Sequence, residues 1–118
     1  MITIYHNPRC SKSRETLALL ETLNQAGDAI HVVEYLKQPP TVAQLKALHR
    51  QLGRPVREMI RDNEVPYKDL NLDDPAISDT QLYDAIAEHP VLLQRPIVVY
   101  GDKAVIGRPP EVVKSLFE

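Results

Sequence analysis

Cysteine is almost absent from this sequence, because Cys10 is the only one among 118 residues. A single thiol excludes a disulfide within the chain, which indicates a reducing compartment. Long hydrophobic runs are also missing, and none approaches the roughly 20 residues that a membrane span needs. The N-terminus lacks the basic, apolar and small-residue pattern of a secretory signal. We therefore expect a cytoplasmic protein without a membrane partner.

An excess of one charge is missing as well. The formal net charge is −2, so no global attraction to nucleic acid or to an anionic membrane surface is expected. His31, His49 and His89 fall in separate predicted elements without metal-ligand spacing, so we expect no bound metal. No apolar stripe is left over for a second copy, which favours a monomer. The length and the 43% hydrophobic content suit one domain over residues 1–118 with its own core.

The order of predicted elements indicates the fold class. Residues 2–5 read as a strand, residues 10–25 as an amphipathic helix, and residues 30–35 as a second, β-branched strand. Such a βαβ unit places its two strands parallel with a right-handed crossover. Residues 96–100 and 103–107 read as a hairpin, and Pro109-Pro110 opens a last helix through Phe117.

The middle of the chain is predicted to be helical. Thr41 and Ser78 each begin a capping-box pattern, and a short segment follows Pro55 as far as Arg61. Together these patterns predict an α/β protein of thioredoxin-like topology. Its four-stranded mixed sheet is flanked by helices, with a helical insertion over roughly residues 41–90 between the βαβ and ββα halves.

The position of Cys10 favours a reactive thiol. It lies at the predicted start of a helix, where unpaired N–H groups and about half a positive charge stabilise an anion. Arg9, Lys12 and Arg14 add cationic charge on either side. An ordinary thiol has a pKa of about 8.5, so only a few per cent is thiolate at neutral pH unless such groups lower it. The alternative is a buried structural cysteine, the commoner fate of a free thiol.

Three arginines stand next to predicted element boundaries. Arg61 ends the short middle segment, Arg95 precedes the strand at Pro96, and Arg108 follows the hairpin. In a thioredoxin fold the loop before the third strand lies against the active-site helix, and its proline is typically cis. We therefore expect Arg95 to project toward Cys10 and Arg108 to reach the same rim. Guanidinium groups suit tetrahedral oxyanions, although a single arginine is more often exposed or paired with a carboxylate.

With these residues in view, the chain resembles the glutaredoxin-coupled arsenate reductases over nearly its whole length. The matching motifs are His6-Asn7-Pro8-Arg9-Cys10, Arg61 with Asn63 and Pro66-Tyr67, His89-Pro90, Arg95-Pro96-Ile97-Val98-Val99, and Arg108-Pro109 with Glu111-Val112-Val113. The chain departs from many detoxifying members at Ser11-Lys12, where those carry Gly-Thr.

The resemblance implies a role for each matched residue. Cys10 matches the nucleophile that forms a thiol–arsenate adduct, and His6 and Ser13 match residues that support its sulfur. Arg61, Arg95 and Arg108 match the arginines that bind the oxyanion. The resemblance also implies glutathione as reducing co-substrate, no bound cofactor, and glutaredoxin as the partner that resolves the adduct and releases arsenite. The lack of a second cysteine fits this scheme, since no internal thiol is available to close the cycle.

Two alternatives remain open on the residues alone. The Cys-x-x-Ser spacing from Cys10 to Ser13 is also typical of a monothiol redox protein acting on glutathione mixed disulfides. A third reading is a binding protein, similar to the thioredoxin-fold regulators that contact RNA polymerase. Those regulators typically carry a Cys-x-x-Cys switch, which this chain lacks. His6 also has an ordinary interpretation as a hydrogen-bonded loop histidine, and Ser13 as a serine in a first helical turn.

Overall fold

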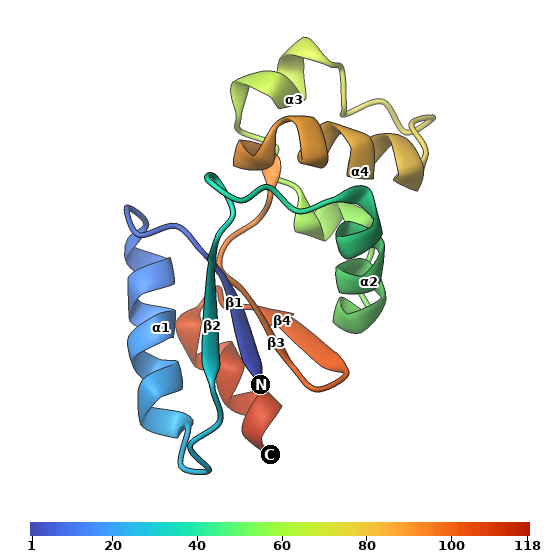
Figure 1. The fold of residues 1–118 in the computed structure, drawn as a ribbon. Helices are drawn as coiled ribbons and strands as arrows, with labels where there is room; N and C mark the ends of the chain where they lie inside the picture. Colours follow the sequence, from blue (N-terminus) through green and yellow to red (C-terminus); the bar gives the residue numbers. More distant parts are fainter. The chain divides into compact units, whose positions relative to one another are not determined.

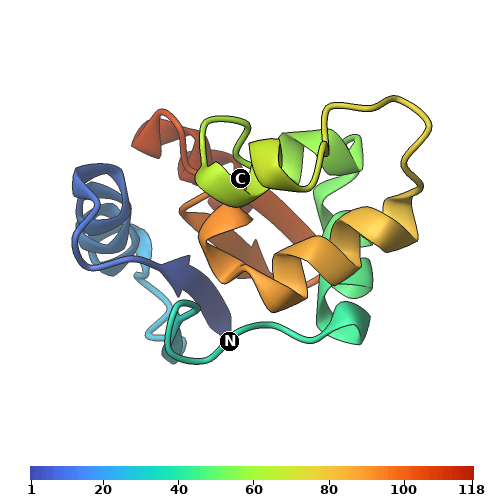
Figure 2. The same cartoon turned by 90° about the horizontal axis from the view of Figure 1, so that it is seen from above.

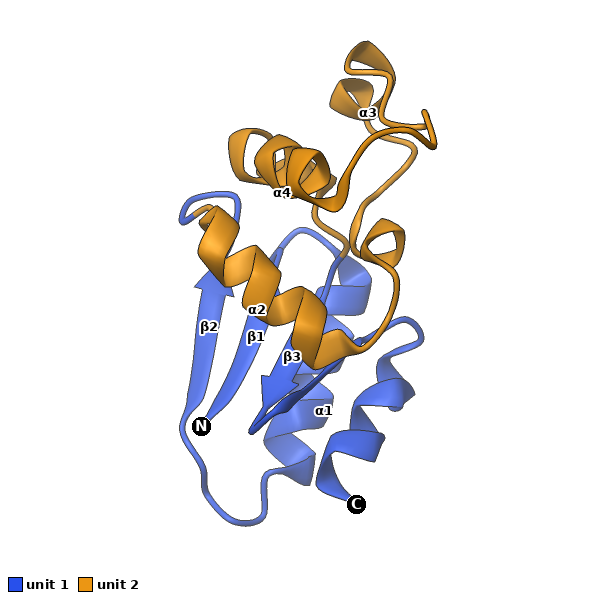
Figure 3. Cartoon of the chain, turned by 90° about the vertical axis from the view of Figure 1, so that its right-hand side faces the viewer, with its two compact units in different colours: residues 1–38, 95–118 blue, residues 39–94 orange.

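The computed structural model describes residues 1–118, which form two compact units. Unit 1 contains residues 1–38 and 95–118, and unit 2 contains residues 39–94 (Figure 3). Both ends of the chain therefore build unit 1, and the middle of the chain builds unit 2. The prediction of a single domain stays a prediction.

Unit 1 is built on a four-stranded mixed sheet in the order β2-β1-β3-β4. Its strands are β1 (Ile2–His6), β2 (Ile30–Glu34), β3 (Ile97–Tyr100) and β4 (Lys103–Ile106). β1 runs parallel to β2 and antiparallel to β3, and β3 and β4 form a hairpin. The turn of that hairpin places Gly101 at φ +64°, a conformation that glycine adopts without cost. The thioredoxin-like fold class predicted from the sequence is confirmed.

Helix α1 (Ser11–Leu23) and the 3₁₀ helix η3 (Pro110–Phe117) pack together in unit 1 (Figure 1). The core between them and the sheet consists of fully buried side chains from five positions: Ile2, Ile4, Leu20, Val98 and Val113. Alternation along β1 buries every second residue, as expected for a strand with one face on a core. Seen from above, the loop between β1 and α1 leads directly from the sheet into the helix (Figure 2).

Unit 2 contains α2 (Val42–Leu52), η1 (Val56–Met59), α3 (Val65–Asp69), α4 (Asp79–Glu88) and η2 (Pro90–Leu92). Both predicted capping boxes are confirmed. The side chains of Thr41 and Ser78 each accept a hydrogen bond from the backbone N–H of the third helical residue, and their own backbone N–H donates to that residue's side-chain oxygen. Gly53 ends α2 in the left-handed conformation at φ 62°. An isolated antiparallel bridge pairs Ile60, which follows η1, with Leu93, which follows η2.

Several boundaries differ from the sequence predictions. β1 extends one residue further, so His6 is the last residue of a strand and not part of a loop. α1 begins at Ser11 and ends at Leu23, with Cys10 as its N-cap. The last helix is a 3₁₀ helix, and α3 and η2 were not predicted. No helix is long and apolar enough to cross a membrane.

Candidate active site

Cys10 lies at the junction between β1 and α1, in a turn closed by Asn7. The Cys10 N–H donates to the Asn7 carbonyl oxygen at 3.0 Å, and the Arg9 N–H donates to Asn7 Oδ1 at 3.0 Å. Such an Asx turn is a local property of asparagine before a loop. Cys10 has extended backbone angles (φ −93°, ψ 123°), as an N-cap residue should, and its side chain is half-buried. The turn therefore presents the sulfur at the positive end of α1.

The surroundings of the sulfur favour the thiolate. Burial alone would raise the pKa of the Cys10 thiol, but the backbone N–H of Ser13, the Arg95 guanidinium and the backbone N–H of Lys12 lower it to about 7. At a pKa of about 7, roughly half of the thiol is ionised at neutral pH.

Only some of the groups expected to lower this pKa do so. The N–H groups of the helix terminus and Arg95 act as expected, whereas the side chains of Arg9, Lys12 and Arg14 are not among the causes. In the structure Lys12 contributes through its backbone N–H, while its ammonium lies 3.7 Å from Glu15. Arg14 donates to the Pro8 carbonyl oxygen at 3.0 Å and so holds the turn. The cation that acts on the sulfur is Arg95, 85 positions away in the sequence.

In unit 1, Arg95 reaches Cys10 and Arg108 contacts Arg95. The Arg95–Pro96 peptide bond is cis, as expected from the fold, and the Arg108–Pro109 bond is cis as well. Arg95 hydrogen-bonds the Cys10 sulfur, and Arg108 Nη1 donates to the Arg95 carbonyl oxygen at 3.2 Å. Arg108 is exposed, so its remaining N–H donors face solvent.

Ser13 and His6, both predicted to support the sulfur, are buried polar residues on either side of Cys10 in the sequence. Ser13 is fully buried, and its Oγ accepts a hydrogen bond from the Asn7 N–H at 3.4 Å. His6 is 6% exposed and pairs in register with Glu34 of β2. Burial lowers the pKa of His6, Glu34 opposes this and Arg14 adds to it, so the neutral imidazole is favoured near pH 7. Its Nδ1 makes no hydrogen bond to any protein group.

Arg61 belongs to unit 2, where its contacts are with other residues of that unit. Its backbone N–H donates to the Leu92 carbonyl oxygen at 2.7 Å. Its guanidinium lies 3.3 Å from Glu64 and 3.4 Å from the Gln94 side-chain oxygen, and the side chain is 13% exposed. Arg61 is thus held by a carboxylate three residues away, the ordinary state of an arginine.

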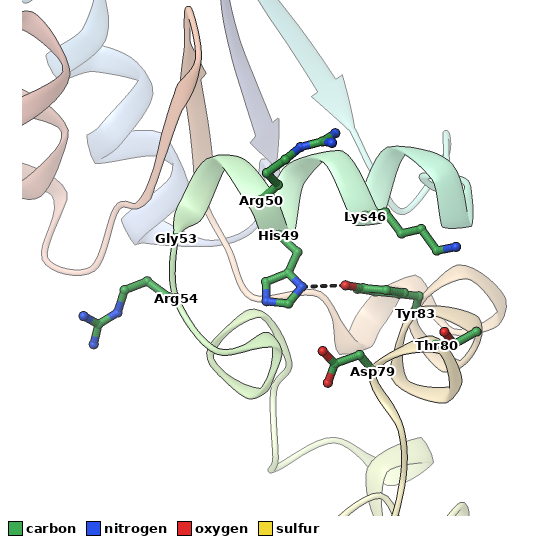
Figure 4. Close-up of a pocket in the computed structure, with 8 residues that line it drawn as sticks. All are labelled: Lys46, His49, Arg50, Gly53, Arg54, Asp79, Thr80 and Tyr83. Carbon is green, nitrogen blue, oxygen red and sulfur yellow. Dashed lines mark hydrogen bonds between the residues drawn. The ribbon is translucent and has the colours of Figure 1, made fainter.

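Unit 2 also has a pocket of about 610 Å³ between α2 and α4 (Figure 4). His49 Nδ1 and the Tyr83 hydroxyl are hydrogen-bonded across it. The remaining lining residues are Lys46, Arg50, Gly53, Arg54, Asp79 and Thr80. None of the residues predicted for the active site lines this pocket. No group of three or more His, Cys, Asp or Glu side chains is placed to hold a metal ion.

Known proteins that are similar to this chain in sequence and in fold include arsenate reductases. The model of the ArsC family matches residues 5–116. An arsenate reductase of Haemophilus influenzae is 50% identical over 98% of this chain and 97% of its own length. An uncharacterized protein of Escherichia coli, YfgD, is also 50% identical, over 98% of this chain and 95% of its own length. The solved structure of an arsenate reductase from Vibrio cholerae has 53% identity and a TM-score of 0.90, covering 98% of this chain and 96% of that one.

Proposed function

The chain belongs to the ArsC family, and on that premise we propose that it reduces arsenate to arsenite with Cys10 as the nucleophile. The observation that carries the proposal is the thiol itself, whose pKa of about 7 is set by Arg95 and two backbone N–H groups. An ionised sulfur next to guanidinium groups suits an anionic electrophile, because the cations offset the repulsion between thiolate and substrate. A relative named as an arsenate reductase, at 50% identity, supports the choice of anion.

The first chemical step forms a sulfur–arsenic bond. The Cys10 thiolate attacks As(V), one arsenic–oxygen bond breaks, and the departing oxygen leaves as water after protonation. Arg95 and Arg108 bind the oxyanion, with Arg108 fixed against the Arg95 carbonyl oxygen. Binding of the oxyanion by Arg61 stays a prediction, since its guanidinium is paired with Glu64 within unit 2. His6, as a neutral imidazole, and Ser13, through its backbone N–H, support the sulfur.

The second stage requires electrons from outside the chain. Conversion of As(V) to As(III) takes two electrons, and Cys10 has no internal thiol to supply the second sulfur. We propose that glutathione attacks the adduct and that glutaredoxin resolves it. Two external thiols become one disulfide, arsenite is released, and Cys10 returns to its reduced form. Omitting either thiol from the assay should stop turnover.

A coupled arsenate-reduction assay tests this function directly. Cys10→Ser should abolish activity, and Arg95→Ala should reduce it by roughly 100-fold or more if the guanidinium stabilises the transition state. Arg9→Ala is the matched control, since Arg9 is exposed and adjacent to Cys10 but does not act on its pKa. The absence of turnover in the wild type, together with failure of arsenate to protect Cys10 from alkylation, would contradict the proposal.

A second function is favoured by one observation, the buried Ser13 at the position of a resolving cysteine. A monothiol protein acting on glutathione mixed disulfides has this arrangement, with Cys10 carrying the glutathione. Mass spectrometry after treatment with oxidised glutathione separates the two functions. Arsenate should block glutathionylation of Cys10 if the oxyanion is the substrate and leave it unchanged if the mixed disulfide is.

A further inference from the structure

Gly107 fills a position in unit 1 that has no room for a side chain. A Cβ added there would lie 2.9 Å from Thr16 Oγ1, 3.2 Å from Thr16 Cγ2 and 3.0 Å from Pro96 Cγ. Contacts this short are not sustained by packed carbon atoms, so a neighbour would have to move. Unlike Gly27, Gly53 and Gly101, Gly107 does not adopt a positive φ. The requirement for glycine is therefore one of space and not of backbone conformation.

Two hydrogen bonds hold Gly107 against the same two neighbours, Thr16 and Pro96. The Gly107 N–H donates to the Pro96 carbonyl oxygen at 2.9 Å, and Thr16 Oγ1 donates to the Gly107 carbonyl oxygen at 3.5 Å. Thr16 is fully buried, so its hydroxyl has an interior partner in place of water. Gly107 thus touches α1 on one side and the segment that begins at Pro96 on the other.

Each of the three segments that meet here carries one residue of the candidate active site. Thr16 lies on α1, which has Cys10 as its N-cap; Pro96 follows Arg95; and Gly107 precedes Arg108. We propose that Gly107, packed against Thr16 and Pro96, is a positioning residue that sets the distance between the Cys10 sulfur and the Arg95 guanidinium. The inference rests on the proposed function for the role of the site, but it acts through the acidity of Cys10 and is measurable without any substrate.

Replacing Gly107 by alanine tests the proposal. The new methyl group forces α1 and the Pro96 segment apart, which weakens the Arg95 interaction with sulfur. The midpoint of the pH profile for alkylation of Cys10 by iodoacetamide should then rise by roughly one unit. Gly101→Ala is the matched control, because a Cβ at Gly101 meets nothing within 4 Å. Its positive φ costs stability, yet the Cys10 midpoint should not move.

A rescue variant distinguishes positioning from general damage. Thr16→Ala combined with Gly107→Ala removes two of the three short contacts, so the midpoint should return toward the wild-type value. Should Gly107→Ala fail to fold, Thr16→Ile presses on the same contact from the helix side and should raise the midpoint as well.

Three results would overturn the proposal. They are an unchanged midpoint in folded Gly107→Ala, an unchanged midpoint in Thr16→Ile, or an equal rise in Gly101→Ala. Because alkylation needs no arsenate, a wild-type protein that fails to reduce arsenate would leave this test intact. The two proposals therefore fail by different observations.

Discussion

Replacing Arg95 by glutamine should raise the pKa of Cys10 without abolishing its ionisation. Arg95 is the only side chain among the groups that lower this pKa from 9.0 to about 7, and it acts by both a hydrogen bond and its charge. The backbone N–H groups of Lys12 and Ser13 remain in the variant. Loss of a cation in direct contact shifts a pKa by about one unit or more, so we expect a value of about 8.

The rate of alkylation changes by less than the thiolate fraction does. At pH 7 the thiolate fraction should fall from about one half to about one tenth. A more basic thiolate is a better nucleophile, by about threefold for one unit at a Brønsted coefficient of 0.4–0.5. The rate at pH 7 should therefore fall only about twofold, while the plateau at high pH should rise about threefold. The two pH profiles should cross.

The assay is the rate of iodoacetamide reaction with Cys10 on reduced protein from about pH 5 to about pH 10, with circular dichroism confirming the fold. Arg9→Gln makes the same change of charge one residue from Cys10, and its midpoint should stay at about 7. A midpoint of about 7 in Arg95→Gln would refute the assigned role of the guanidinium. An equal shift in Arg9→Gln would assign the effect to net charge instead of contact.

Two further predictions concern stability. Because the folded state lowers the pKa of Cys10 from 9.0 to about 7, ionisation favours folding, and the gain should grow as pH rises from about 7 to about 9. Urea unfolding of wild type and Cys10→Ser at several pH values should thus show a difference that is flat below about pH 6, increases through this window and levels off above it; a difference independent of pH would contradict the reasoning. Ser78→Ala removes the acceptor for the Gln81 N–H at 3.2 Å and should cost about 1 kcal/mol, whereas Thr80→Ala in the same turn should cost little by the same urea measurement.

The parts of the fold that depend on local spacing were predictable. Both capping boxes join residues three apart, so Thr41 and Ser78 reveal their helices without any knowledge of packing. The parallel pairing of β1 with β2 and the β3–β4 hairpin follow from the predicted βαβ unit and the hairpin pattern. By contrast, α3 (Val65–Asp69) has five residues and none is buried, so it leaves no apolar periodicity to detect. His6 continues the burial alternation of β1, but because histidine is polar it did not extend the apolar pattern that predicts a strand.

The candidate site was predictable only in part, because some of its contacts leave no pattern of spacing in the sequence. The N-terminal position of Cys10 follows from the sequence, and the approach of Arg95 follows from the fold class once it is known. The hydrogen bond from Arg14 to the Pro8 carbonyl depends on turn geometry that no spacing encodes. The Arg61–Glu64 pair has i,i+3 spacing and was detectable as a competitor for the oxyanion. Asn7 carried a signal too, since asparagine before proline is typical of a turn.

The dependence of the thiolate on main-chain N–H groups determines which neighbouring positions are free to change. Residue 12 acts on the sulfur through its peptide group, while its side chain contacts Glu15 near the surface. Exchange of Lys12 for almost any residue therefore preserves the acid strength of Cys10, with proline as the exception because it has no N–H. The identity of the side chain at residue 12 is therefore a poor guide to whether the thiol is reactive, whereas a change at residue 95 is an informative one.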